Sequence, residues 1–123
     1  MRMKPVRRGE HHFVEKKWGD ETWLDNSDLY CGKILRFKKG HHTSLHFHYK
    51  KTETMFCADG RFRIRMLDTE NGEEYWIELN PGDTLLIQPT QPHEIWGMGD
   101  NNILIEFSTE HFDEDSYRLG QPG

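Results

Sequence analysis

The stretch from Gly40 to Gly60 reads GHHTSLHFHYKKTETMFCADG and holds two histidines and a glutamate between its flanking glycines. On a strand, side chains two positions apart point to the same face, so His46 and His48 present both imidazoles to one side. A short turn can follow, after which Glu53 enters the neighbouring antiparallel strand across from the histidine pair. The stretch therefore predicts three metal ligands on a single hairpin.

A fourth ligand is expected from a later segment, GDTLLIQPTQPH, which spans residues 82–93 and ends at His93. Three neutral imidazoles and one carboxylate suit borderline divalent metals such as zinc, manganese, nickel, cobalt or iron, and the residue types alone do not choose among these. We therefore expect one divalent metal ion bound by His46, His48, Glu53 and His93.

The rest of the chain has the pattern of an all-β protein. From Gly32 onward, short apolar segments alternate with turn residues about every 8 to 12 positions, which is typical of a sandwich or barrel. The pairs Asp59-Gly60 and Asn71-Gly72 predict hairpin turns, and the first would join residues 54–58 to residues 61–67. Pro81-Gly82 predicts a type II turn. No long segment has a helical period, so we expect little helix.

Composition limits the classes of function. The 123 residues, 34% hydrophobic and 30% charged, fit one soluble domain. A net charge of −5 with scattered basic residues argues against nucleic-acid binding. No apolar run approaches the ~20 residues that span a bilayer and no signal peptide is visible, so we expect a cytoplasmic protein without membrane contacts. Cys31 and Cys57 are too few for a disulfide framework and are expected to be free.

The two metal-binding segments together resemble the paired motifs of the cupin superfamily, G-x5-H-x-H-x3,4-E-x6-G and G-x5-P-x-G-x2-H. The first motif matches at every defined position, whereas the second has six residues between Gly82 and Pro89, and Gln91 stands where glycine is frequent. The resemblance covers about residues 33–107. It implies a single antiparallel barrel of about six to eight strands, a jelly roll, with the metal inside.

Further segments resemble the isomerase domain of type II phosphomannose isomerases and related small cupin sugar isomerases. They are KKWGDE at 16–21, GKIL at 32–35, IEF at 105–107 and DEDSYR at 113–118. The chain departs from that family at His46, where glutamine is usual, and at Lys51, where arginine is usual. The resemblance implies metal-dependent aldose–ketose interconversion of a sugar or sugar phosphate, and these departures leave the particular substrate open.

Such a reaction polarises two adjacent oxygens and moves a proton between two carbons. Four protein ligands in an octahedral sphere leave two positions for a carbonyl and a hydroxyl of the sugar. Lys51 and Glu106 are the candidate catalytic bases. Lys33 and Arg118 are candidate contacts for a phosphate or a sugar hydroxyl, and Trp18 can stack on the sugar ring, although a packed core or interface tryptophan is the preferred interpretation.

Two other functions stay open, because fold and metal alone do not fix an activity. The same ligands can serve an Fe(II)-dependent dioxygenase, which would need an oxidisable substrate and a mostly apolar pocket. A non-catalytic module that binds a metal, a sugar or an anion is the third class.

The remaining features are expected to be structural. We interpret the other histidines as packed or solvated side chains, and the acidic stretch 110–115 as a solvated face. These histidines are His11, His12, His41, His42 and His111. The expected layout is one domain over residues 1–123, with an N-terminal arm at 1–31, a core at about 32–108 and a C-terminal tail at 109–123, in a chain that can form a homodimer.

Overall fold

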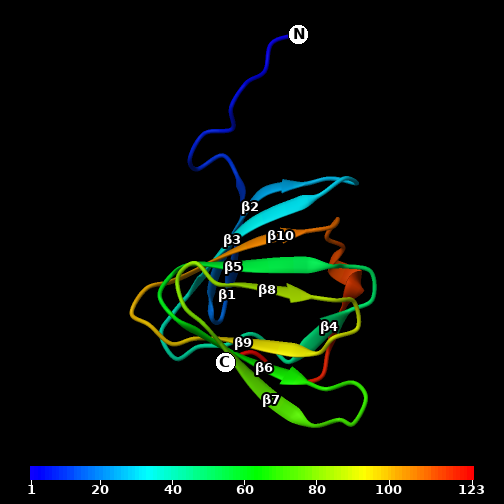
Figure 1. Cartoon of the computed structure of the whole chain (residues 1–123). Helices are drawn as coiled ribbons and strands as arrows, with labels where there is room; N and C mark the ends of the chain where they lie inside the picture. Colours follow the sequence, from blue (N-terminus) through cyan, green and yellow to red (C-terminus); the bar gives the residue numbers. More distant parts are fainter.

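The computed structural model describes residues 1–123 and is all-β, with one turn of 3-10 helix, η1, at Asp113–Asp115 (Figure 1). This confirms the predicted fold class and the scarcity of helix. The strands are β1 (His12–Lys16), β2 (Gly19–Asn26), β3 (Cys31–Phe37), β4 (His46–His48), β5 (Glu53–Asp59), β6 (Phe62–Leu67), β7 (Glu74–Leu79), β8 (Thr84–Ile87), β9 (His93–Gly97), β10 (Asn102–Ser108) and β11 (Ser116–Arg118). No helix is long and apolar enough to cross a membrane.

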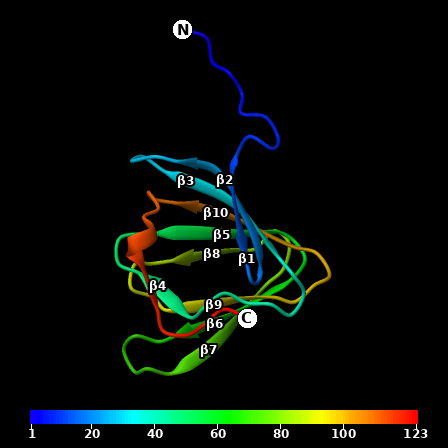
Figure 2. The same cartoon turned by 180° about the vertical axis from the view of Figure 1, so that it is seen from behind.

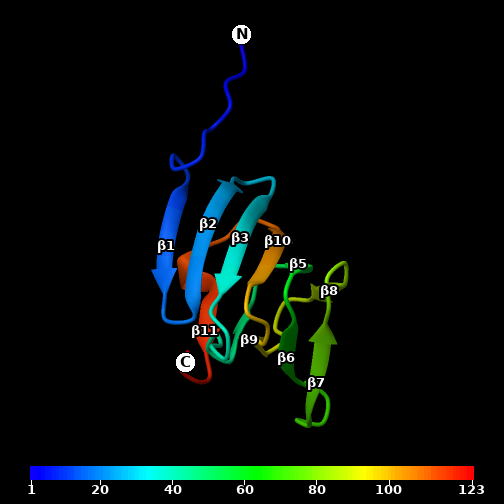
Figure 3. The ribbon, with the colours of Figure 1, turned by 90° about the vertical axis from the view of Figure 1, so that its left-hand side faces the viewer.

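The strands form two antiparallel sheets that enclose one interior, as in a jelly roll. The larger sheet has the order β1-β2-β3-β10-β5-β8, and the smaller has the order β11-β4-β9-β6-β7. Figure 3 shows β1, β2, β3 and β10 side by side in the larger sheet, with β6 and β7 of the smaller sheet on the other side. From β3 onward the chain crosses from one sheet to the other at every connection except that between β6 and β7, and the interior receives side chains from both sheets.

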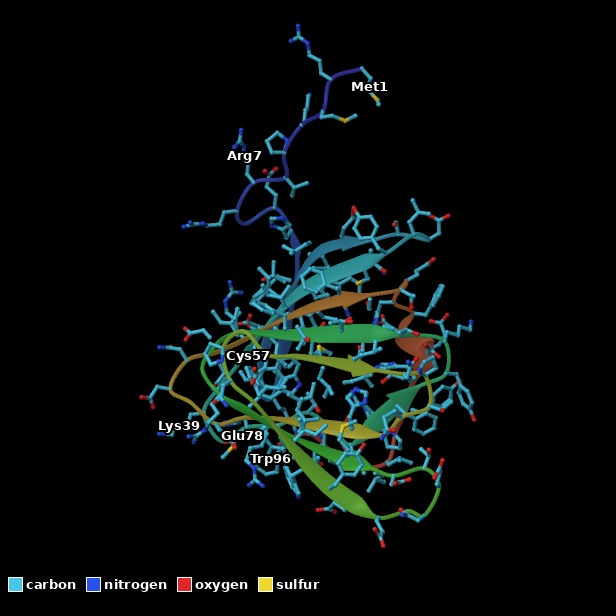
Figure 4. All side chains as sticks on the ribbon, in the orientation of Figure 1. Met1, Arg7, Lys39, Cys57, Glu78 and Trp96 are labelled. Carbon is cyan, nitrogen blue, oxygen red and sulfur yellow. The ribbon has the colours of Figure 1, made fainter.

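The N-terminal arm is shorter than predicted, because residues 12–26 form β1 and β2 of the larger sheet instead. Strand β2 pairs with both β1 and β3, so these residues are part of the barrel wall. Gly19 allows the close approach of the strands, since a Cβ at this position would overlap the carbonyl oxygen of Arg36. The first strand begins at His12, and the stretch from Met1 to Arg7 runs away from the barrel (Figures 2 and 4).

Two of the three predicted turns are confirmed and one is wrong. Asn71-Gly72 lies in the loop that joins the paired strands β6 and β7. At Pro81-Gly82, the Asp83 N–H donates to the Asn80 carbonyl at 2.9 Å and Gly82 has a φ of 94°, as a type II turn requires.

Asp59-Gly60 does not close a hairpin, because β5 pairs with β10 and β8 whereas β6 pairs with β7 and β9. The glycine instead carries the chain from the larger sheet to the smaller one. It has a φ of 79°, and a Cβ there would overlap the main chain of Asn101 and Asn102. The local sequence requires positive φ at this point but does not reveal which sheet the next strand enters.

The interior is divided along the strands into an apolar half and a polar half. On β3, the inward residue Lys33 is followed two positions later by Leu35, and on β5 Glu53 is followed by Met55. The apolar half is one cluster, which contains Trp18, Leu35, Phe37, Met55, Cys57, Phe62, Ile64, Met66, Leu79, Ile87, Ile95 and Leu104. Both cysteines are buried and free, as expected. This core holds the sheets together and leaves the other half of the interior for polar side chains.

Candidate metal centre and active site

Three histidines of the smaller sheet converge in the polar half. His46 and His48 lie on β4, and His46 is the cross-strand partner of His93 on β9. One ring nitrogen from each residue lies within 4.8 Å of the other two. The three side chains therefore form a cluster that can hold a metal ion.

Each ring is oriented by a hydrogen bond to a main-chain carbonyl. Nδ1 of His46 lies 2.8 Å from the Ser44 oxygen, Nδ1 of His48 lies 3.0 Å from the Asp115 oxygen, and Nδ1 of His93 lies 2.9 Å from the Gln91 oxygen. Because a carbonyl only accepts, Nδ1 carries the proton in all three rings. A neutral ring then has its lone pair on Nε2, which is the arrangement found in metal-binding histidines.

The surroundings keep two of these rings neutral. Burial, reinforced by His93, lowers the pKa of His46 to about 3. Burial and the nearby Lys51 cation lower the pKa of His48 to about 4. Both imidazoles are therefore uncharged at neutral pH without any metal, in the form that binds one.

Glu53 faces the histidines from the opposite sheet, which corrects the predicted hairpin. It begins β5 of the larger sheet, where its cross-strand partners are Ser108 and Ile87, whereas the histidines belong to the smaller sheet. Its Oε1 atom lies 3.0 Å from Nε2 of His93. The group thus joins the two sheets across the interior.

The contact between Glu53 and His93 gives a test of whether these residues fit a metal. Oε1 of Glu53 and Nε2 of His93 are both buried and neither makes a hydrogen bond. Since Nδ1 of His93 already carries the proton, two lone pairs face each other in a site where unpaired polar atoms are costly. A cation shared by the two atoms removes this conflict, so the residues fit a divalent metal.

Lys51 connects this group to a second carboxylate. Its side chain is only 4% exposed, and Nζ lies 3.3 Å from Glu53 Oε2, 3.2 Å from Glu106 Oε2 and 3.1 Å from His111 Nδ1. Burial opposes its charge, but Glu106 and Glu53 raise the pKa of Lys51 above its ordinary value. The two candidate bases are thus in direct contact beside the histidine cluster.

The two carboxylates respond differently to the one ammonium that they share. Although burial acts the other way, the Lys51 ammonium holds the pKa of Glu53 below its ordinary value. Burial, followed by the charge of Glu53, raises the pKa of Glu106 despite Lys51 and Lys33 nearby. Glu106 is therefore the carboxyl that takes up a proton more readily.

His111 links Lys51 to the surface. Its Nδ1 atom accepts from Lys51 Nζ, so its proton lies on Nε2, which donates to Asp113 Oδ1 at 2.9 Å. Asp113 is exposed to solvent. His111 also lines the cavity beside the histidine cluster, together with His12, so the expectation of purely structural histidines is too narrow.

The C-terminal segment completes the site. It crosses from β10 in the larger sheet to β11 in the smaller one, passing the ends of β5 and β8 (Figure 2). Asp115 is 3% exposed, and its carboxylate accepts hydrogen bonds from the main-chain N–H groups of Tyr49, Lys50 and Lys51. The stretch 110–115 is therefore not wholly a solvated face, since one of its carboxylates organises the loop between His48 and Glu53.

These residues line a cavity of about 400 Å³ that has 24 lining residues, six of them hydrophobic. Lys33 projects into it with Nζ 3.6 Å from Glu21 Oε1 and 4.0 Å from the centre of the Trp23 ring. Arg118, on β11, also lines the cavity. Trp18 reaches its wall but stacks on Phe37 at 4.2 Å in the apolar cluster, in agreement with the packed interpretation.

A model of the family described as Cupin domain matches residues 33–105, more than half of the chain. The chain belongs to the cupin family. No curated protein matches this cupin in a sequence comparison.

Solved structures share the fold of this cupin. The capsular polysaccharide assembling protein CapF from Staphylococcus aureus is 21% identical with a TM-score of 0.80, covering 89% of this chain and 32% of its own. Oxalate decarboxylase from Bacillus subtilis is 19% identical with a TM-score of 0.79, and the match covers 89% of this chain and 30% of that protein. The Lactobacillus farciminis oxalate decarboxylase is 22% identical with a TM-score of 0.77, and the match covers 89% of this chain and 34% of that protein. This cupin spans about a third of the length of those proteins.

Sequence reasoning did not single out four residues of the cupin site. Glu21 and Trp23 lie two positions apart on β2, a spacing that marks one face of a strand and was available as a signal. His111 and Asp115 lie in an acidic stretch whose composition is that of a solvated surface. Only their contacts with Lys51 and with the loop after His48 reveal their place.

Proposed function

We propose that the protein is a metal-dependent isomerase that interconverts an aldose and a ketose, with a sugar or sugar phosphate as its substrate. The observation that carries the proposal is the contact of Lys51 Nζ with Glu106 Oε2 at 3.2 Å, inside a mainly polar cavity and beside the histidine cluster. The resemblance of the chain outside its metal-binding segments to type II phosphomannose isomerases agrees with it.

His46, His48, His93 and Glu53 are the residues that would hold the metal. When bound, a divalent ion supplies Lewis acidity and a template for two adjacent substrate oxygens. The protein's own contribution is to fix the three Nε2 atoms through main-chain hydrogen bonds and to bring one carboxylate from the opposite sheet.

Glu106 is the proposed proton carrier. Isomerisation removes a proton from one carbon and returns it to the neighbouring carbon, so the catalytic group must take up and release a proton readily. The raised pKa of Glu106, caused by burial and by Glu53, suits this task. Lys51 stays protonated between the two carboxylates, and its ammonium can stabilise negative charge that develops on a substrate oxygen.

The hydrogen-bonded series from Lys51 through His111 to Asp113 gives the site a route for proton exchange with water. Lys51 Nζ donates to His111 Nδ1, and His111 Nε2 donates to the exposed Asp113 carboxylate. A proton held at the Lys51–Glu106 pair can therefore exchange with solvent while the substrate fills the cavity. We expect the reaction to incorporate solvent hydrogen at the substrate carbon.

The cavity lining favours a polyhydroxylated or anionic substrate. Lys33 is 2% exposed and its ammonium makes no hydrogen bond, having only the Glu21 carboxylate at 3.6 Å and the face of the Trp23 ring. Its N–H donors are available to a hydroxyl or phosphate oxygen, and Arg118 offers a second cationic donor. A dioxygenase for an apolar substrate would need a more apolar lining than six hydrophobic residues in 24.

Hydrogen exchange tests the proposal directly. The protein, loaded in turn with each candidate metal, is incubated in D₂O with hexoses, pentoses and their phosphates, and NMR follows deuterium at the carbon next to the carbonyl. We expect exchange and ketose formation with at least one sugar. A Glu106→Gln variant should abolish both, whereas Glu114→Gln, an exposed neighbour on η1, should leave them unchanged.

The other functions predict different results. Oxygen uptake on an enediol or thiol substrate without sugar exchange would move the protein to the dioxygenases. Sugar or anion binding without exchange or oxygen uptake would make it a binding module.

A further inference from the structure

Asn26, the last residue of β2, is hydrogen-bonded to the main chain of His111, which lies 85 positions away along the chain. Its Nδ2 atom donates to the His111 carbonyl oxygen at 3.0 Å, and its Oδ1 atom accepts from the His111 N–H group at 2.8 Å. A side-chain amide carries a donor and an acceptor side by side, so it can pair with both main-chain groups of one residue. His111 lies between β10 and η1, outside any strand, and its main chain makes no other hydrogen bond. Asn26 thus fixes a piece of main chain that no sheet holds.

A β-bulge in β2 turns Asn26 toward this segment. The register of β2 against β3 shifts after Trp23, where Leu24 is an extra residue without a cross-strand partner. In a regular strand Trp23 and Asn26, three positions apart, would face opposite sides of the sheet. The extra residue reverses the alternation, so Asn26 lies opposite Cys31, whose side chain is buried in the interior. Bulges re-aim side chains in this way beside active sites.

The ring of His111 makes three further contacts. Trp23 packs edge to face against it with 5.1 Å between the ring centres. Nδ1 accepts from Lys51 Nζ at 3.1 Å, and Nε2 donates to Asp113 Oδ1 at 2.9 Å. Because the side chain has only two torsion angles, the position of the main chain decides which atoms the ring nitrogens reach. A shift of the main chain by about 1 Å would carry Nδ1 beyond hydrogen-bonding distance of Lys51.

The polar partners of the ring cannot fix this position by themselves. The Asp113 side chain is 89% exposed, and a contact with so exposed a carboxylate contributes little to holding a neighbour in place. The Lys51 ammonium is held by two buried carboxylates and keeps them whether or not His111 is in reach. The two main-chain hydrogen bonds of Asn26 are therefore the anchor that sets the location of His111.

We propose that Asn26 is a positioning residue, which holds His111 where its Nδ1 atom accepts from Lys51. Asn26 does not line the cavity, so it touches no substrate and acts through His111. By this contact it keeps open the proton route from the Lys51–Glu106 pair to solvent. The role in the route rests on the proposed isomerase activity, whereas the placement of His111 is a property of the folded protein alone.

Nitrogen NMR of the zinc-loaded protein tests this placement without any substrate. A long-range proton–nitrogen spectrum of protein labelled at its histidines shows which ring nitrogen carries the proton, and His111→Phe identifies the His111 signals. We expect His111 to be protonated at Nε2 in the wild type. In Asn26→Ala this Nε2–H signal should be lost or averaged with that of a second tautomer. Asp28→Ala, an exposed residue just after β2, is the matched control and should keep the signal.

The same variants test the role in the proton route. Asn26→Ala should lower kcat by about 10- to 100-fold and leave KM unchanged, because it misplaces a group of the route without touching the substrate. In D₂O less deuterium should enter the product per turnover, since a proton that cannot reach solvent is returned to the substrate. Added to His111→Phe, Asn26→Ala should have no further effect, because both changes act on one group.

The outcomes separate this proposal from the isomerase proposal. Circular dichroism establishes that each variant is folded, and Asn26→Leu, similar in shape but without hydrogen-bonding groups, replaces Asn26→Ala if needed. An unchanged Nε2–H signal in the folded variant would overturn the proposal, as would a further loss of kcat when Asn26→Ala is added to His111→Phe. A wild type without sugar turnover would contradict the isomerase activity instead, and the NMR result would still decide whether Asn26 places His111.

Discussion

Asp115 fixes His48 and the loop that follows it, through its main-chain oxygen and its side-chain carboxylate. Its main-chain oxygen lies 3.0 Å from His48 Nδ1, and its carboxylate accepts the N–H groups of Tyr49, Lys50 and Lys51. One residue of the C-terminal segment thereby fixes the ring of a candidate ligand and the loop that leads from it to Glu53. The metal centre consequently depends on the docking of a segment far away in sequence.

Replacing Asp115 should therefore weaken metal binding without any change to a ligand. We expect Asp115→Ala to lower metal affinity by about 10–100-fold, the range found for residues that orient metal ligands. Asp115→Asn keeps an acceptor oxygen and should be affected less. Competition with a chromogenic chelator measures both, and Glu114→Gln is the control. Equal affinities for wild type and Asp115→Ala would contradict the role given to this carboxylate.

The metal-free protein should lose stability in mild acid. His46 and His48 have pKa values of about 3 and about 4 in the folded state, below their ordinary value of 6.5. Below pH 6.5 these histidines bind protons in the unfolded chain but not in the folded one. The free energy of unfolding is therefore highest, as far as these two groups are concerned, above pH 6.5, and it decreases as the pH falls toward 4. Urea unfolding of chelator-treated protein at pH 7 and pH 5 measures it.

A variant shows whether these two histidines cause the effect. His46→Gln with His48→Gln should flatten the pH dependence between 6.5 and 4.5, because glutamine does not titrate. An unchanged slope in the double variant would assign the acid sensitivity to other groups.

Removal of Lys51 should be costly because two buried carboxylates share its charge. Lys51→Met leaves Glu53 and Glu106 without a counter-ion, and breaking such a pair destabilises a protein by about 3–5 kcal/mol. In Lys51→Met with Glu106→Gln one carboxylate is neutral, so we expect a smaller loss. Chemical denaturation of the single and double variants measures the difference. Additive losses would mean that Lys51 and Glu106 do not interact.

The same lysine is expected to matter for turnover. If the isomerase proposal holds, Lys51→Arg, which keeps the charge, should fold and should lower turnover by about 10²–10⁴-fold, because the donor no longer has the same position. Glu114→Gln again supplies the control. Wild-type turnover in Lys51→Arg would remove Lys51 from the reaction.

The sequence predicts the candidate ligands but not the geometry that assembles them. The spacing of His46, His48 and Glu53 is the same whether the chain turns back in a hairpin or crosses to the other sheet. The pairing of β5 with β10, a strand remote in sequence, decides between the hairpin and the crossing. The positive φ at Gly60 depends on local sequence and was therefore predictable. The pairing partners of the strands on either side of it depend on remote residues and were not.

The burial of charged residues was equally beyond local sequence reasoning. Lys51 follows Lys50 in a segment that reads as a solvated turn, yet one side chain is buried among carboxylates and the other is exposed. His111 and Asp115 acquire their roles only through contacts with residues 60 or more positions away along the chain. Patterns of two and four residues carry no information about such contacts.

Chelation should destabilise the protein without unfolding it. Metal that binds only the folded form raises its apparent stability, so EDTA should lower the melting temperature. The apolar cluster of twelve residues does not include the ligands, which is why the metal-free barrel should stay folded. Circular dichroism with and without EDTA measures this. Complete unfolding on chelation would indicate a structural metal site instead.

The central claim is that ligands from both sheets hold one divalent ion, and metal analysis of the purified protein tests it most directly. Plasma mass spectrometry of wild type should give about one metal per chain, with very little metal in His48→Ala and in the double variant His46→Ala, His48→Ala. Glu53→Gln should bind more weakly than wild type, because it loses the charged ligand from the opposite sheet. Full metal occupancy in the double histidine variant would contradict the assignment of this centre.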